Sequence, residues 1–253
     1  MGSIQILSRE FYRLAAREGS FVAVMLFPLL LWRRLCAVNR RPQQERDPSG
    51  GVFDAHYGVA TGGVIPATHL DVSQRIWIHS FGYQGVVPDE LEALWPSLDI
   101  DYPKTVFIDF GAGKGRALML AAKRPFKGVI GVEITPELCV TAKANLKVFE
   151  GHNDCCAPAE VLCSDASSYE LPSDPLVLFL YNPFGTPVME QVTANLSGSL
   201  RLYPRRSVVI YIRPELAELW DLMPEFSLVS SGARLRIYDN RSQLESSMPT
   251  ELM

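Results

Sequence analysis

The feature that most constrains the fold is a glycine-rich loop between a strand-like and a helix-like segment. Residues 105–110 are rich in Val, Phe and Ile and predict a buried strand, and a helix pattern covers residues 115–123. The loop between them reads Asp109-Phe110-Gly111-Ala112-Gly113-Lys114-Gly115. Glycines permit a tight turn and a close approach of a ligand to the backbone, and a helix N-terminus presents free N–H groups. The sequence therefore predicts a ligand site at the end of this strand.

Strand-like and helix-like segments alternate after the loop. Further strands are predicted at residues 128–132, 161–163, 176–181, 207–212, 226–229 and 234–238, and further helices at 136–149, 188–200 and 214–222. Such alternation favours a mainly parallel, doubly wound sheet, and the short turn between the last two strands predicts an antiparallel hairpin. We therefore expect a Rossmann-like α/β domain over residues 104–240, with a seven-stranded, mostly parallel sheet closed by that hairpin.

The chain before this domain divides into three zones. Residues 1–38 predict an N-terminal helical extension, residues 39–51 a linker, and residues 52–103 a lid or pre-domain segment with turn-prone clusters at 53–63 and 81–88. A short helix is expected at 89–95. Residues 241–253 are expected to form a tail.

The N-terminal extension has an uncharged centre over residues 21–32. This run is shorter than the ~20 apolar residues of a spanning helix. Arginines follow it closely, at Arg33, Arg34, Arg40 and Arg41. An apolar helix with a basic flank suits an anionic membrane surface, but it suits packing on the domain or on a second subunit equally well. Both interpretations stay open.

Charge and cysteine content bear on partners and compartment. The net charge of −4 argues against nucleic acid as a partner. The 5 cysteines are odd in number and irregularly spaced, which favours a reducing, cytoplasmic compartment. Any association with a membrane would be through the N-terminal helix. His152, Cys155, Cys156 and Cys163 lie close in sequence, but they contain no Cys-x-x-Cys pair, so we expect no metal site.

The spacing within the glycine loop separates three kinds of nucleotide site. A P-loop is excluded because Ile108 stands at the position of its first glycine and Gly115 at its hydroxyl position. A dinucleotide fingerprint is excluded because Arg116 replaces its third glycine. The stretch instead resembles motif I of class I S-adenosylmethionine methyltransferases, Asp-x-Gly-x-Gly-x-Gly. The resemblance implies S-adenosyl-L-methionine as the cofactor, bound by Asp109, Gly111, Ala112, Gly113 and Gly115.

Acidic residues follow the next two predicted strands in phase with this loop. Glu133 ends the second strand of the domain, where a carboxylate can accept hydrogen bonds from both ribose hydroxyls, and Ile134 follows it. The methyltransferase resemblance places Asp165 and Ala166, after the third strand, beside the adenine amino group. It places Asp109 near the amino end of the methionine part.

The fourth strand ends in Tyr181-Asn182-Pro183-Phe184, which resembles motif IV of the amino methyltransferases, Asn/Asp-Pro-Pro-Tyr/Phe. In such a motif, amide and backbone oxygens accept hydrogen bonds from the acceptor N–H groups and aim its lone pair, and the ring packs on the substrate. We therefore expect these four residues to be catalytic, with Asn182 also beside the cofactor. A single proline replaces the usual two, which argues against planar amines such as adenine. A plain Asn-Pro turn is the alternative interpretation.

The stretch from Tyr83 to about Ile212 is also similar to small lysine methyltransferases of the histone-lysine and ATP-synthase c-subunit type. The similarity lies in Tyr83 with Val87-Pro88, in the loop sequence Asp-x-Gly-x-Gly-Lys-Gly-Arg, and in Glu133. It implies methyl transfer to an amine, either a protein lysine or a small molecule. A small-molecule O-methyltransferase is the alternative enzyme, and a non-catalytic cofactor-binding scaffold is the alternative from another class.

Overall fold

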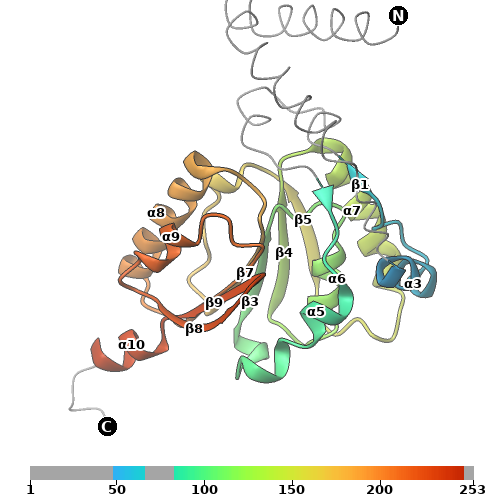
Figure 1. Ribbon diagram of the computed structural model, residues 1–253. Helices are drawn as coiled ribbons and strands as arrows, with labels where there is room; N and C mark the ends of the chain where they lie inside the picture. Colours follow the sequence, from blue (N-terminus) through green and yellow to red (C-terminus); the bar gives the residue numbers. More distant parts are fainter. Residues whose placement is uncertain (1–47, 66–82, 248–253) are drawn as a thin grey trace, which may run out of the picture. The chain divides into compact units, whose positions relative to one another are not determined.

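The computed structural model describes residues 48–65 and 83–247 (Figure 1). The predicted N-terminal helix at 1–38, and the predicted linker up to residue 47, lie outside these residues. Within the described ranges, no helix has the length and hydrophobicity that crossing a membrane requires.

The centre of the molecule is a seven-stranded sheet with the order β5-β4-β3-β6-β7-β9-β8. Its strands are β3 Val106–Phe110, β4 Gly128–Glu133, β5 Ala159–Cys163, β6 Leu176–Tyr181, β7 Ser207–Ile212, β8 Ser227–Gly232 and β9 Leu235–Asp239. Every pair from β5 to β7 is parallel, whereas β9 is antiparallel to both β7 and β8. The predicted fold class, a Rossmann-like and mostly parallel sheet with a closing hairpin, is therefore confirmed.

Helices cover both faces of this sheet (Figure 1). One face packs against α5 Pro88–Glu92, α6 Arg116–Ala122 and α7 Pro136–Phe149, and the other packs against α8 Thr186–Leu202 and α9 Ala217–Asp221. Neighbouring residues of β3 therefore belong to different cores: Phe107 packs on the α6 side and Ile108 on the α8 side, and both are fully buried. Burial on both faces explains the continuous apolar runs in the sequence. Short 3-10 turns occur at η2 Trp95–Ser97, η3 Tyr102–Lys104 and η4 Ala166–Ser168.

The strand order reverses direction between β3 and β6. From β3 the chain adds β4 and β5 on one side, and it then returns to add β6 and β7 on the other. In open α/β sheets the crevice for a ligand lies at the carboxyl ends of the strands on either side of such a switch point. The topology therefore directs attention to the residues that follow β3 and β6.

Two segments differ from their predicted structure. Residues predicted as the end of the linker and as a turn-prone cluster form helix α3, Pro48–Tyr57. Its two glycines disfavour a helix, but Phe53 and Tyr57, one turn apart, are buried against the core on the α6 side, and this packing overrides local propensity. The beginning of the predicted tail forms helix α10, Arg241–Ser247.

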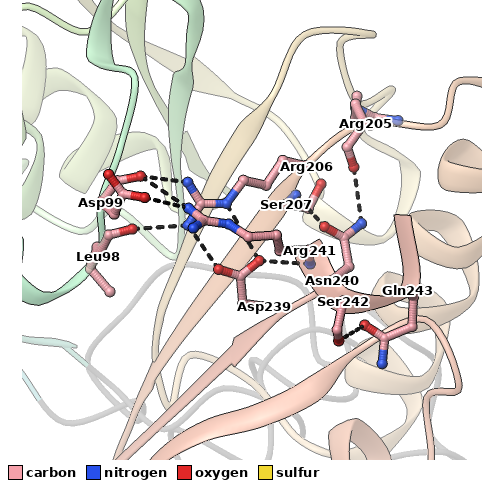
Figure 2. Close-up of polar contacts among 10 residues, drawn as sticks. All are labelled: Leu98, Asp99, Arg205, Arg206, Ser207, Asp239, Asn240, Arg241, Ser242 and Gln243. Carbon is pink, nitrogen blue, oxygen red and sulfur yellow. Dashed lines mark hydrogen bonds and ion pairs between the residues drawn. The ribbon is translucent and has the colours of Figure 1, made fainter. Parts of the chain in front are cut away.

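Polar contacts tie α10 and β9 to the amino ends of the strands (Figure 2). The Arg206 guanidinium lies 2.8 Å from Asp239 and also donates to the carbonyl oxygens of Leu98 and Asp99. Arg241 of α10 donates to the Asp99 carboxylate at 2.8 Å. These contacts attach the beginning of α10 to the sheet, and the rest of the predicted tail, residues 248–253, lies outside the described residues.

Candidate functional site

A cavity of about 340 Å³ opens at the carboxyl ends of β3, β4, β5 and β6. This volume lies within the range of small-molecule sites, roughly 300–1,000 Å³. Twelve predicted site residues line it: Asp109, Gly111, Ala112, Gly113, Glu133, Ile134, Asp165, Ala166, Tyr181, Asn182, Pro183 and Phe184. The structure thus brings all predicted catalytic residues, and all predicted cofactor residues except Gly115, into one cavity.

The glycine loop passes very close to two other segments. A Cβ atom on Gly111 would lie 2.5 Å from Pro183, and one on Gly113 would lie 2.3 Å from the Tyr83 ring. Both glycines also have positive φ angles, +83° and +56°. Only glycine meets both demands without strain, so the loop requires these residues for packing as well as for an approaching ligand.

Gly115 has a different position from the other loop glycines. It is the N-cap of α6, with φ of +86°, and it faces Ala142 of α7. It does not line the cavity. Its place in the motif is explained by the turn into α6, and no contact with a ligand is needed to account for it.

Glu133, at the end of β4, has both carboxylate oxygens fixed by backbone groups. Oε2 accepts a hydrogen bond from Gly113 N at 2.8 Å, and Oε1 accepts one from Thr135 N at 2.8 Å. Each carboxylate oxygen has a further lone pair. The side chain is therefore held in one orientation while it keeps accepting capacity toward the cavity.

Asp109, at the end of β3, is the most electrostatically unfavourable group in the cavity. Its residue is only 3% exposed, and within the described part of the chain its carboxylate has no hydrogen-bond or ion-pair partner. Burial, together with the nearby negative charge of Glu133, holds the pKa of Asp109 well above its ordinary value. A cation bound in the cavity would remove this penalty.

Asp165 follows β5 and begins the turn η4. Its Oδ1 accepts hydrogen bonds from the backbone N–H of Ser167 at 2.8 Å and from the Ser167 hydroxyl at 2.7 Å. The carboxylate lines the cavity beside Ala166, with the apolar side chains of Ile134 and Leu138 also in the wall. This side of the cavity combines one acceptor with flat apolar surface.

The residues after β6 form the other side of the cavity. Asn182 has a φ of +41°, in the left-handed region that asparagine tolerates better than most residues. Its Oδ1 faces the Tyr211 hydroxyl at 3.4 Å, and Phe184 packs into the core on the α8 side. Burial raises the pKa of Tyr181, and the Arg213 guanidinium lies 5.4 Å from the centre of its ring.

Several residues that line the cavity were not predicted as part of the site. They are Val64, Tyr83, Gln84, Gly85, Val86, Arg116, Ala117, Val132, Thr135, Leu138, Phe179, Ser164, Val188 and Arg213. Arg213 directly follows β7 as Asn182 directly follows β6, and it also has a positive φ, +50°. Its position one strand further from the switch point was a usable signal. Gln84 gave none, because it reaches the cavity only through the pairing of two short strands, β1 Val64–Ile65 and β2 Tyr83–Gln84.

The cysteine-rich segment contains no cluster of three potential metal ligands within the described ranges. His152 Nε2 lies 3.2 Å from the carbonyl oxygen of Tyr57 instead. Cys155 is half-buried and Cys156 and Cys163 are exposed, all as free thiols.

Neither a protein-family model nor a curated protein matches the sequence. Solved structures do match. A ribosomal protein L11 methylase from Lactobacillus delbrueckii subsp. bulgaricus is 15% identical with a TM-score of 0.46, over 62% of this chain and 79% of that one. Magnesium protoporphyrin IX methyltransferase from Synechocystis, with bound SAM, is 15% identical with a TM-score of 0.42, over 60% and 77%. An RNA methyltransferase from Salinibacter ruber, in complex with S-adenosyl-L-homocysteine, is 17% identical with a TM-score of 0.41, over 62% and 92%. Similarity at this level does not assign an activity to the chain.

Proposed function

We propose that this chain is an S-adenosylmethionine-dependent methyltransferase whose acceptor is an amine, on a protein lysine or on a small molecule. The observation that carries the proposal is the meeting of three carboxylates around one glycine loop. Asp109, Glu133 and Asp165 come from the ends of three adjacent strands and line the same cavity. Acids at successive strand ends are far apart in sequence, so their convergence on the loop points to one ligand with several polar groups.

The donor and acceptor groups of the cavity fit this cofactor. The fixed carboxylate of Glu133 suits a pair of ribose hydroxyls, and the unpaired carboxylate of Asp109 suits an ammonium group. Asp165 would accept from an adenine amino group, with Ile134 and Ala166 against the ring. The bound cofactor supplies a methyl group on a positively charged sulfur.

The chain's own part in the reaction is to orient the acceptor. Asn182 lines the cavity at the switch point, and its amide oxygen, which accepts a hydrogen bond from the Tyr211 hydroxyl at 3.4 Å, keeps a second lone pair. An acceptor N–H that donates to this lone pair would have its nitrogen lone pair directed toward the methyl carbon. Tyr181 and Phe184 provide aromatic surface beside that point. An amine needs little more than alignment, because its lone pair is already nucleophilic once the amine is neutral.

One observation favours nitrogen over oxygen as the acceptor atom. No His or Lys is among the described residues that line the cavity. Burial also raises the pKa of Tyr181, which makes it a poor base at neutral pH. A hydroxyl acceptor needs such a base to lose its proton. An amine is therefore the favoured acceptor, and O-methylation is the alternative.

Calorimetry on the full chain tests the cofactor part of this proposal. We expect S-adenosylmethionine and S-adenosylhomocysteine to bind, whereas ATP and NAD, which lack the amino acid group, bind much more weakly. Transfer of a labelled methyl group to lysine peptides and to small primary amines, with matched alcohols as controls, tests the acceptor. Absence of binding by both adenosyl compounds would overturn the proposal. Binding with no transfer to any amine would favour a non-catalytic scaffold.

A further inference from the structure

A segment outside the main sheet makes polar contacts with the glycine loop. In this segment, residues 54–63, the Asp54 carboxylate accepts hydrogen bonds from the backbone N–H groups of Thr61 at 2.9 Å and Gly62 at 2.7 Å. It also accepts one from the Thr61 hydroxyl. The Asp54 carboxylate therefore fixes the turn that follows α3, by accepting hydrogen bonds from the backbone of the turn and from the Thr61 side chain.

Thr61 is fully buried and holds two side chains of the cofactor site at once. Its hydroxyl, which donates to Asp54, accepts a hydrogen bond from Arg116 Nε at 2.7 Å. Its carbonyl oxygen accepts one from the Tyr83 hydroxyl. Both Tyr83 and Arg116 line the cavity, whereas Thr61 and Asp54 do not.

The two side chains that Thr61 holds lie against the glycine loop. The Tyr83 ring fills the space that a Cβ atom on Gly113 would occupy, and Gly113 N donates in turn to Glu133. Arg116 is the first residue of α6, and its guanidinium also donates to the carbonyl oxygen of Val86 at 3.0 Å. A continuous chain of contacts thus leads from Asp54 to the carboxylate proposed to bind the ribose.

Two further contacts attach the same segment to the loop. Lys114 Nζ donates to the carbonyl oxygen of Gly62 at 2.7 Å. Asn145 of α7 accepts from Ala60 N at 2.9 Å and donates to the carbonyl oxygen of Lys114 at 2.9 Å. The Lys114 and Asn145 side chains therefore connect residues 60–62 to the glycine loop.

Thr61 places the Asp54 carboxylate close to the buried Arg116 guanidinium. The Arg116 residue is only 2% exposed, and a buried guanidinium is costly without a nearby negative charge. The Asp54 carboxylate lies one hydroxyl group away, on the other side of Thr61. Gly85 leaves room for this arrangement, because a Cβ atom there would lie 2.8 Å from the guanidinium.

We propose that Asp54 and Thr61 are positioning residues that hold Tyr83 and Arg116 against the loop, so that residues 54–63 clamp residues 111–115 in the conformation that binds the cofactor. The identity of that cofactor rests on the function proposed above. The clamp itself is a property of the ligand-free chain. Neither Asp54 nor Thr61 reaches the cavity, so both act through other side chains.

The test compares Thr61→Val with Thr61→Ser in the full chain. Valine keeps the shape of threonine but removes the hydroxyl that joins Asp54 to Arg116, whereas serine keeps the hydroxyl. Tyr83→Phe removes the hydroxyl that donates to the Thr61 carbonyl, and it replaces Thr61→Val in the test if that variant does not fold. Tyr57→Phe is the control, because it removes a hydrogen bond of the same segment, to Asp154 at 2.6 Å, without touching the loop.

Hydrogen exchange of the loop amides in the ligand-free protein is the first measurement. We expect exchange of residues 111–115 to be about tenfold faster in Thr61→Val, with a change in the same direction in Tyr83→Phe, because each variant loses a buried hydrogen bond. Thr61→Ser and Tyr57→Phe should exchange as the wild type does. The second measurement is affinity for S-adenosylhomocysteine, which should fall in the same two variants by about tenfold.

The two measurements separate the clamp from the proposed function. Unchanged loop exchange in both Thr61→Val and Tyr83→Phe would overturn the clamp. Faster exchange in Tyr57→Phe as well would also overturn it, since any loosening of the segment would then have the same effect. If the wild type binds no adenosyl compound, the proposed function fails, and the exchange data alone still decide the clamp.

Discussion

The two ends of the central sheet hold their charged residues in opposite ways. At the carboxyl ends, Asp109 is buried beside Glu133 with no cation paired to it within the described residues. At the amino ends, Arg206 pairs with Asp239 and Arg241 pairs with Asp99 (Figure 2). The first arrangement costs stability and the second adds to it. The carboxyl end therefore keeps a buried acid for which a ligand cation could be the partner, whereas the amino end pairs its charges and stabilises the fold.

The largest expected effect is on cofactor affinity in Glu133→Ala. This change removes the carboxylate that both Gly113 and Thr135 orient, and with it the two charge-assisted hydrogen bonds proposed for the ribose hydroxyls. We expect affinity for S-adenosylhomocysteine to fall by about 100-fold or more, measured by calorimetry. Circular dichroism should show a folded protein. Affinity close to that of the wild type would remove Glu133 from the site.

Asn182 tests whether the same end of the sheet also holds the acceptor. Asn182→Gly removes the amide but accommodates the left-handed backbone, φ +41°, better than alanine does. We expect methyl transfer to fall by about 100-fold while cofactor affinity changes by less than about twofold, since the contact proposed for the Asn182 amide is with the acceptor. A variant that retains full turnover would show that Asn182 is part of a structural turn.

Asp109→Asn should separate stability from binding. At neutral pH the ligand-free variant should be more stable than the wild type by about 1–2 kcal/mol, because the buried charge is gone. Affinity for S-adenosylmethionine should fall by about tenfold, because the ammonium group loses its partner. Thermal unfolding and calorimetry measure the two effects. A variant that loses both stability and affinity would contradict the proposed cost of this carboxylate.

The pH dependence of stability tests independently whether the Asp109 carboxylate destabilises the folded protein. The pKa of Asp109 is raised in the folded state, so this side chain stays protonated to a higher pH in the folded protein than in the unfolded chain. The free energy of unfolding of the wild type, relative to Asp109→Asn, should therefore be highest below about pH 4 and fall as the pH rises toward the folded-state pKa. A rise over this range would mean that the carboxylate is stabilised in the folded protein.

The smallest effect on cofactor affinity is expected from a change at the amino ends of the strands. Arg206→Met removes the ion pair with Asp239 and two bonds to backbone carbonyls, and it should lower the free energy of unfolding by about 2 kcal/mol. Cofactor affinity should not change, because this cluster lies at the opposite end of the sheet from the cavity. Denaturant unfolding and calorimetry measure both quantities. If Arg206→Met lost as much cofactor affinity as Asp109→Asn, the two ends of the sheet would not have separate roles in binding and in stability.

Most of the main domain could be predicted from the sequence because its signals are local. Continuous apolar runs mark strands that are buried on both faces, such as Leu176–Tyr181, and turn residues separate them from helices. The glycine loop could be predicted for the same reason, since the spacing of its glycines alone distinguishes it from other nucleotide-binding loops. Acids at strand ends could be found because parallel strands bring their carboxyl ends to one edge.

The segments that surround the glycine loop could not be predicted, because they reach it only through long-range contacts. Helix α3 contains two glycines and forms because Phe53 and Tyr57 find a core to pack against. Tyr83 was visible in the sequence, but its place on Gly113 depends on a contact between residues 30 positions apart, and the role of Thr61 depends on Arg116, which is 55 positions away. The fold class and the residues expected to hold a cofactor could be predicted from sequence patterns alone. Only the folded chain showed which distant segment holds the loop in place, because such contacts leave no local pattern.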